Sequence, residues 1–517
     1  MLWIRGGDVV DGARPRRRAD VLVRGERVEA VVDGGLEGAP EGALVLEAGG
    51  LVVAPGLVDM HSHDDVAAQD PDVYEAKIRQ GVTTAAVSMD GLGFAPLEPS
   101  SQASLLRYWR PVDGAPGSVG GSNLGAYAAS LRGRLGLDLA IGVAHGNVRI
   151  ATAGFALRPL TADELGRAVH DAQALAEEGA YGLSTGLGYV PALAADESEL
   201  VAMARAVRAG GGRLYVTHMR DYGVAIFAAL DEAAAVARRS GLGMHLSHLH
   251  LSHPDVLGLA PRLLERLEAI AATGVEVSYD TYPYDAGSSI LYSYLPPWVA
   301  DGGPDRLLDR LGEEAVLERL DVECRAPGHG WQAVVVASSG SGAFVGESVA
   351  QIAARLGLTP IRAMARLLRE EDLDVAAIVH QTLAADDIQI AETAACVVGS
   401  DGIPYGQRRH PRYSGAFAAY YRRHVVERRA FGLEEAVLRM SLRPAALLGL
   451  GPHGPRVGAR ASLMVFDPGA YRDRSTFEAP RLPAEGVRHV LVGGGVVLRD
   501  GVFDAAVRPG VWLRRAT

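Results

Sequence analysis

Histidine and aspartate residues stand at the ends of several apolar runs, where their side chains could bind a metal ion. His61 and His63 follow the run LVVAPGLVDM, His218 ends YVTH, His248 ends MHLSH, and Asp401 follows ACVVGS. Imidazole nitrogen and carboxylate oxygen are ligands that suit Zn²⁺. The HxH spacing places both imidazoles on one side of a strand. A carboxylate beside a metal-bound water is also a natural general base, and Asp401 is the candidate.

Each of these signals is weak when it stands alone. An HxH pair is often two polar residues in a turn, a single His after a strand is often structural, and an Asp before Gly often begins a turn. His245 and His250 are rival ligands in the segment that holds His248, and alternation places His248 and His250 on one side of the strand. The repeated placement of His and Asp at strand ends nevertheless favours a metal site.

Residues this far apart in the sequence can meet only if the fold brings several strand ends together. The middle of the chain alternates short apolar runs with amphipathic stretches such as TADELGRAVHDAQALAEEG and PRLLERLEAIAATG. The candidate strands are LVVAPGLVDMHSH, VTTAAVSMD, DLAIGVAHG, AYGLSTG, GRLYVTHMR, GLGMHLSHLH, GVEVSYDTY and AACVVGSDG. This alternation predicts an α/β fold with a parallel (β/α)8 (TIM) barrel, whose active site lies at the carboxyl ends of its strands. An open, doubly wound sheet is the alternative.

The two chain ends differ in character from the middle. Both read as short β-branched strands cut by Gly and Asp, which predicts one small β-sandwich domain built from residues 1–54 and 455–517. Residues 55–454 then form the barrel. The alternation breaks between about 291 and 346, a stretch rich in Gly and Pro, and we expect an insertion at the barrel mouth there.

Composition excludes several classes of protein. The net charge is −11 and the arginines are dispersed, which argues against a nucleic-acid partner. Two cysteines, Cys324 and Cys396, are too few for a disulfide scaffold or a multi-cysteine zinc module. No signal-peptide pattern and no run of ~18 apolar residues is evident, so we expect a cytoplasmic protein with no membrane partner.

With these residues in place, the chain resembles the D-aminoacylase (N-acyl-D-amino-acid deacylase) family of the metal-dependent amidohydrolases over almost its whole length. The segments that carry the resemblance are APGLVDMHSHDD, QGVTT, HGNVR, GLSTGLGYVP, YVTHMR, DTYPYDAGSS, LPPW, VVGSDG, HPRYSGAF and SLRPAALLGL. The resemblance implies a distorted barrel and a zinc cofactor. His218 and His248 match its tight metal site, and His61, His63 and Asp401 match a second, often weaker site.

The resemblance also implies substrate contacts and marks two departures. Tyr189 matches a residue that helps to polarise the scissile carbonyl, and Arg412, Tyr282 and Ser289 match the pocket for the substrate α-carboxylate. The family often has a bridging Cys after the second strand, and Asp90 takes that place in VSMDG. It often has a Lys two residues after the sixth-strand His, and this chain has His250 there.

The lysine count separates this chain from hydantoinases and dihydroorotases, which typically bridge two metals with a carboxylated Lys after the fourth strand. Lys77 is the only lysine and lies before the second strand, too early for that role. We therefore expect hydrolysis of linear N-acyl-D-amino acids. A neutral His250 at its reference pKa favours neutral or hydrophobic side chains over acidic ones, although Arg220 beside His218 offers an alternative cation.

Two other functions remain open at this point. One is a related hydrolase that acts on cyclic amides or on dipeptides with a C-terminal D-residue. The other is a metal-binding protein without catalysis, which would have no need for a base such as Asp401. The sequence leaves the acyl group, the number of metals and the oligomeric state open.

Overall fold

A computed structural model describes residues 1–38, 41–114 and 119–516 of the chain. Its centre is a parallel barrel, with the strands in chain order around the ring. Its strands are β6 (Leu57–Asp59), β7 (Val82–Val87), β8 (Asp138–Ile141) with β9 (Val143–Ala144), β10 (Gly182–Gly186), β11 (Leu214–His218), β12 (Gly243–Leu246), β13 (Val277–Thr281) and β17 (Cys396–Val398). The ring closes where Met60 N–H donates to Val398 O at 3.2 Å. The predicted barrel is therefore confirmed, and the open sheet is excluded.

Helices cover the outside of the barrel because their apolar faces pack on its strands. They are α1 (Pro71–Ile78), α2 (Gln102–Asp113), α3 (Leu124–Leu131), α4 (His145–Ala153), α5 (Ala162–Glu177), α6 (Glu197–Ala209), α7 (Ile226–Ser240), α8 (Ala260–Ala271), α13 (Ala384–Ala391), α14 (Arg412–Tyr421), α15 (Leu433–Val437) and α16 (Arg443–Leu447). Helix α5 starts at a capping box, in which Thr161 and Glu164 satisfy each other's backbone N–H groups.

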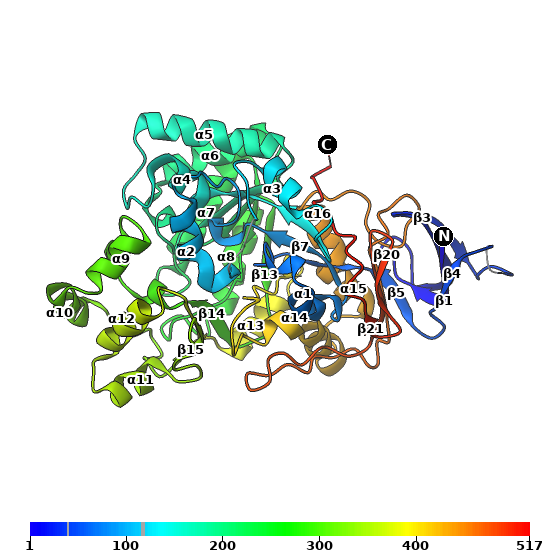
Figure 1. Cartoon of the computed structure of the whole chain (residues 1–517). Coiled ribbons are helices and arrows are strands. Elements are labelled where there is room, and N and C mark those ends of the chain that lie inside the picture. The colour runs from blue at the N-terminus through cyan, green and yellow to red at the C-terminus, as the bar shows by residue number, and fades with distance from the viewer. Residues whose placement is uncertain (39–40, 115–118, 517) are drawn as a thin grey trace.

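Strands from both chain ends form one nine-stranded sheet at one end of the molecule (Figure 1). They are β1 (Leu2–Val9), β2 (Arg17–Arg24), β3 (Arg27–Asp33), β4 (Leu44–Glu47), β5 (Val52–Pro55), β18 (Leu463–Phe466), β19 (Val487–Val492), β20 (Gly495–Arg499) and β21 (Val502–Phe503). The two halves join where β5 pairs antiparallel with β18. Val53, Leu463 and Leu491 belong to one buried cluster, so the chain ends share a core.

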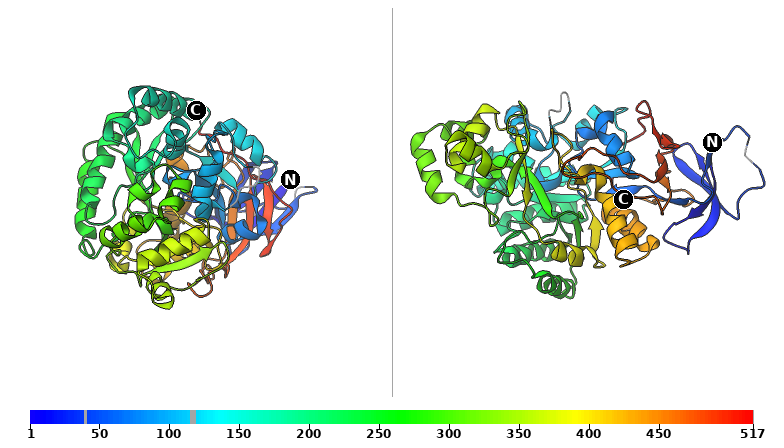
Figure 2. Two further views of the ribbon diagram at one scale, coloured as in Figure 1. Left: turned by 60° about the vertical axis from the view of Figure 1, so that its left-hand side comes forward. Right: turned by 90° about the horizontal axis from the view of Figure 1, so that it is seen from below.

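A second extension lies at the opposite end of the barrel from the terminal sheet (Figures 1 and 2). It holds a three-stranded antiparallel sheet of β14 (Ala286–Ile290), β16 (Val375–His380) and β15 (Val334–Ser339). Its helices are α9 (Pro304–Arg310), α10 (Glu314–Glu323), α11 (Val349–Leu356) and α12 (Pro360–Glu370). This insertion between β13 and β17 is longer than the expected range of about 291–346. Its sheet includes β14, which precedes that range, and β16, which follows it, and these two strands pair with each other. Among the described residues, none of the helices has the length and apolar character to cross a lipid bilayer.

Candidate metal centre and substrate pocket

The barrel brings the six expected metal ligands together at the carboxyl ends of five strands. They follow or end β6, β7, β11, β12 and β17, and they form two groups whose ligand atoms lie within 4.8 Å of one another: His61, His63, Asp90 and Asp401, and Asp90, His218 and His248. Asp90 belongs to both groups. Asp90, His248 and Asp401 each have positive φ angles, of 55°, 34° and 47°. Such non-glycine conformations cluster at functional sites, where the surrounding structure holds them.

Several distances between donor atoms fit a tetrahedral metal, whereas His218 Nδ1 and His248 Nε2 lie only 2.9 Å apart. Atoms about 2.0–2.2 Å from a zinc ion at tetrahedral angles lie about 3.3–3.6 Å from one another. Asp401 Oδ1 is 3.5 Å from His61 Nε2 and 3.3 Å from His63 Nε2. Asp90 Oδ1 is 3.6 Å from His61 Nε2 and 3.7 Å from His218 Nδ1. His61 Nε2 and Asp90 Oδ1 are buried and make no hydrogen bond with the described residues, as expected of atoms that face a metal.

The charges of the site favour a cation between the carboxylates. Burial lowers the pKa of His61, but the surrounding carboxylates, Asp280 first, outweigh it and raise the pKa to about 10. Burial lowers the pKa of His218 to about 3, which keeps that imidazole neutral and able to coordinate. Burial raises the pKa of Asp401, but Arg412 and His61 outweigh it and hold the pKa well below its usual value. Asp401 is therefore an anion, as a ligand or a base must be.

Sequence reasoning missed Asp280, the penultimate residue of β13, which contacts ligands of both groups. Its Oδ1 accepts the backbone N–H of His248 at 3.0 Å, and its Oδ2 lies 3.5 Å from His61 Nδ1. Oδ2 is also 3.0 Å from His245 Nε2, so the rival ligand His245 is engaged away from the metal groups. The signal was present in GVEVSYDTY, an apolar run with a carboxylate near its end, much as Asp401 follows the run ACVVGS.

The expected substrate-binding residues divide between the cavity wall and the layer beneath it. Tyr189, Tyr282 and Ser289 line the cavity, and the Tyr189 hydroxyl is 3.5 Å from Ser289 Oγ. Arg412 begins α14 and is fully buried, with its guanidinium carbon 4.4 Å from the centre of the Tyr282 ring. Its Nη1 is 2.9 Å from Asp401 Oδ2. In this structure Arg412 is paired with Asp401, so a substrate carboxylate must compete for it.

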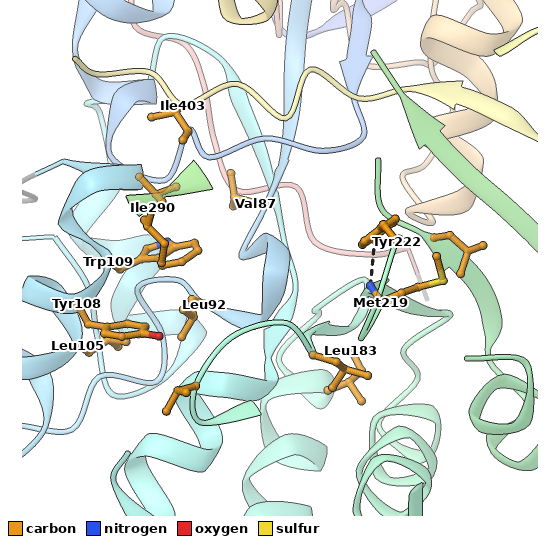
Figure 3. Packing of buried hydrophobic residues seen from close by; sticks show 14 of the residues in the cluster. Val87, Leu92, Leu105, Tyr108, Trp109, Leu183, Met219, Tyr222, Ile290 and Ile403 are labelled. Carbon is orange, nitrogen blue, oxygen red and sulfur yellow. Dashed lines mark hydrogen bonds between the residues drawn. The ribbon is translucent and has the colours of Figure 1, made fainter. Parts of the chain in front are cut away.

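The cavity above these residues has a volume of about 400 Å³, enough for a small organic acid. Met219 and Tyr222 line it and are joined by a hydrogen bond of 3.0 Å from the Met219 N–H to the Tyr222 hydroxyl (Figure 3). Trp109, which the sequence did not single out, lies on the other side of that view and packs edge-on against Tyr189 at 5.8 Å. Only its position after the second strand could have suggested it.

Neither candidate cation of this cavity, His250 or Arg220, is available to pair with an acidic side chain of a substrate. His250 is stacked on Tyr222 at 4.8 Å, and burial lowers its pKa to about 3. Arg220 lines the cavity, but its Nη2 and Nε contact the Glu232 carboxylate at 2.9 and 3.1 Å. Its remaining donors reach the carbonyls of Leu193 and Ala195. Arg220 is thus neutralised in place.

Comparisons with known proteins identify the family of this chain. The model of the amidohydrolase family matches residues 307–498. An N-acyl-D-glutamate deacylase of Alcaligenes xylosoxydans xylosoxydans is 35% identical, over 99% of this chain and 96% of its own. A D-aminoacylase of the same organism is 31% identical, over 100% and 98%. The crystal structure of N-acyl-D-glutamate deacylase from Bordetella bronchiseptica, complexed with zinc and a phosphonate inhibitor, superposes with a TM-score of 0.83 at 32% identity, covering 99% of both chains. The chain therefore belongs to the D-aminoacylase family of metal-dependent amidohydrolases.

Proposed function

We propose that this enzyme hydrolyses the amide bond of N-acyl-D-amino acids and releases a carboxylate and a free D-amino acid. The observation that carries the proposal is the placement of Asp401, which adjoins His61 and His63 on one side and Arg412 on the other. One carboxylate thus stands between a metal group and a cation suited to the carboxylate of an amino acid. Relatives named as deacylases of D-amino-acid derivatives support the same reading.

The metal in this proposal is zinc, because the donors are imidazole nitrogens and carboxylate oxygens gathered within 4.8 Å of one another. His218 and His248 with Asp90 form the tight site, and His61, His63, Asp90 and Asp401 form a second, weaker one. Asp90 stands where the family often has a Cys, and a carboxylate is a harder ligand than a thiolate. The metal affinity and occupancy of the two sites can therefore differ from those of relatives with the Cys. When bound, zinc lowers the pKa of a water ligand and polarises a carbonyl.

Asp401 and Tyr189 supply the proton chemistry of the proposed reaction. Asp401 takes a proton from the attacking water and later delivers it to the leaving nitrogen, as a general base and then acid. Burial raises the pKa of Tyr189 well above its usual value, so the hydroxyl stays protonated. It therefore donates a hydrogen bond to the carbonyl oxygen as negative charge develops there.

Selection of the D-centre follows from fixing two ends of the substrate together. Arg412, with Tyr282 and Ser289, binds the α-carboxylate, and a guanidinium can do so with two hydrogen bonds. Tyr189 holds the acyl carbonyl at the other end. With carboxylate and carbonyl both fixed, D- and L-substrates place the side chain and the α-hydrogen in opposite positions, so a pocket that accepts the side chain in only one of them selects the D-centre.

The side chain of the substrate is neutral or hydrophobic in this proposal. A buried carboxylate without a partner is costly, and neither candidate cation is available to it. His250 is neutral, Arg220 is paired with Glu232, and the acidic Asp221 lines the same cavity. An apolar side chain gains roughly 1.5–3 kcal/mol on full burial, which is enough to set a preference.

A substrate panel tests the proposal. Zinc-loaded enzyme is incubated with matched N-acetyl-D- and N-acetyl-L-amino acids, with hydantoins and with dipeptides that end in a D-residue, and released amine is measured. We expect turnover of the N-acetyl-D series and at least ~100-fold slower turnover of the L series. Faster hydrolysis of the cyclic amides or the dipeptides identifies a related amidohydrolase activity instead and contradicts the proposal.

A further inference from the structure

The only lysine of the chain, Lys77, lies fully buried on α1, whereas the other 50 of the 51 basic residues are arginines. Its ammonium group contacts Asp59 and donates to Ser400 Oγ at 2.6 Å. It also lies 3.3 Å from Asp64 Oδ2. Three partners around one nitrogen suit the compact ammonium, which has three donors, better than a planar guanidinium.

Asp59 and Ser400 connect this lysine to ligands that follow the first and the last strand of the barrel, β6 and β17. Asp59 Oδ1 accepts the backbone N–H groups of Ser400 at 2.8 Å and of His61 at 3.4 Å, and the Ser400 hydroxyl donates to Asp59 Oδ2 at 2.6 Å. The next residue, Asp401, donates its N–H to His61 O at 2.8 Å. The segment with His61 and the segment with Asp401 are thus held together through Lys77 and its partners.

Asp64 connects Lys77 to His63, the other histidine of the metal group that contains His61. It directly follows His63, and its Oδ2 accepts the Ser62 hydroxyl at 2.5 Å. Its Oδ1 accepts the Tyr413 hydroxyl at 2.8 Å, and Tyr413 directly follows Arg412. The Lys77 ammonium lies 4.7 Å from the centre of the Tyr413 ring.

We infer that Lys77 is a positioning residue for the metal group of His61, His63 and Asp401, acting through Asp59, Asp64 and Ser400. Each carboxylate that Lys77 neutralises is within two residues of an expected ligand, and Ser400 is adjacent to one. Burial lowers the pKa of Lys77, but Asp59 and Asp64 outweigh it and raise the pKa above its usual value, so the ammonium stays charged. Without this charge, two buried carboxylates would repel each other and separate the loops that hold the ligands.

This inference rests on the proposed function, because it assigns Lys77 to the metal group that the reaction uses. The alternative is a purely structural ion pair, whose loss would lower stability and leave the metal geometry intact. The chain offers a matched control for that alternative. Arg149 and Glu199 form another ion pair of equal burial, between α4 and α6, and their further partner is His145 rather than an expected ligand.

The test compares Lys77→Met and Ser400→Ala with Arg149→Met in the full-length enzyme. Ser400→Ala removes one hydroxyl and leaves the buried charges paired, so it remains informative if Lys77→Met does not fold. The measurements are the affinity for Co²⁺, the visible absorption of the Co²⁺-loaded enzyme, kcat and KM, and the thermal midpoint. The absorption spectrum reports ligand geometry independently of turnover.

We expect Lys77→Met and Ser400→Ala to lower Co²⁺ affinity or kcat by about 10- to 100-fold and to alter the spectrum, with KM changed much less. Arg149→Met should lower the thermal midpoint and leave the spectrum and kcat near wild type. If both Lys77→Met and Ser400→Ala match wild type in spectrum and kcat, or if Arg149→Met changes them equally, the inference is overturned. Wild-type enzyme that neither binds Co²⁺ nor cleaves the amide instead overturns the proposed function, and the inference with it.

Discussion

The guanidinium of Arg412 lies 2.9 Å from the carboxylate of Asp401, so the proposed substrate clamp and the proposed general base form an ion pair. Both are buried, and the charge of Arg412 is the main influence that holds the pKa of Asp401 low against the effect of burial. A substrate carboxylate that binds Arg412 must therefore compete with Asp401. Changes at either residue are expected to affect the other.

Replacement of Asp401 by Asn is expected to cut kcat by at least ~10²-fold, the usual scale for losing an acid–base group. The fold and the metal held by His218, His248 and Asp90 should remain, because Asp401 is not in that group. Steady-state kinetics with zinc analysis and circular dichroism check this. Turnover near wild type would show that another residue is the base.

Replacement of Arg412 by Ala is expected mainly to raise KM for an N-acetyl-D-amino acid, because a clamp binds ground state and transition state alike. A smaller loss of kcat should accompany it, since Asp401 loses its buried partner. The matched substrate is the C-terminal amide, which wild type should use poorly and which the substitution should affect little. An equal loss on acid and amide would contradict the role of Arg412 as a carboxylate clamp.

Removal of metal is expected to abolish activity. Active preparations should contain zinc, and a chelator should inactivate them until zinc is added back. Metal analysis and a chelation–reconstitution series make the measurement. His218→Ala should lower the zinc content more than His63→Ala does, because it belongs to the group assigned as the tight site. Active enzyme without a transition metal would contradict the metal assignment.

N-acetyl-D-leucine is expected to have a higher kcat/KM than N-acetyl-D-glutamate. In the variant Glu232→Gln, Arg220 loses its counter-charge and becomes available to an acidic side chain, so the ratio should shift toward the glutamate substrate. The measurement is kcat/KM for both substrates with the wild-type enzyme and with the variant. A clear preference of wild type for the glutamate would show that the pocket is assigned wrongly, and Arg220→Ala would then identify the cation.

Asp387 is expected to make a contribution to stability that falls between about pH 4 and pH 7. Burial raises the pKa of this carboxyl to about 7 in the folded chain, against a usual value of 3.8. The folded state holds the proton more tightly than the unfolded state, so stability decreases as pH rises through this window and is level above it. Asp387→Asn should be more stable than wild type by roughly 2–4 kcal/mol at pH 8. Urea unfolding that shows the same difference at pH 4 and pH 8 would exclude this origin.

The sequence by itself determined the barrel strands and most of the candidate ligand positions. Short apolar runs that alternate with amphipathic stretches marked the barrel strands, and β6, β11, β12 and β17 each lie at or just before a predicted ligand. That inference works because parallel strands in a barrel present their carboxyl ends on one face, whatever the spacing between them in the chain. Asp90 came from resemblance, since a carboxylate before Gly91 is not distinctive by itself.

Only the tertiary structure decided which side chains share a partner. Asp280 joins His61 to the backbone of His248, Lys77 joins Asp59 to Ser400, and Arg220 is neutralised by Glu232. These pairings depend on the closure of the ring and on distances between strands that are not adjacent in sequence. A polar residue in an apolar run looks the same in sequence whether it faces a ligand, a counter-charge or the cavity, and only its burial and its neighbours separate these cases.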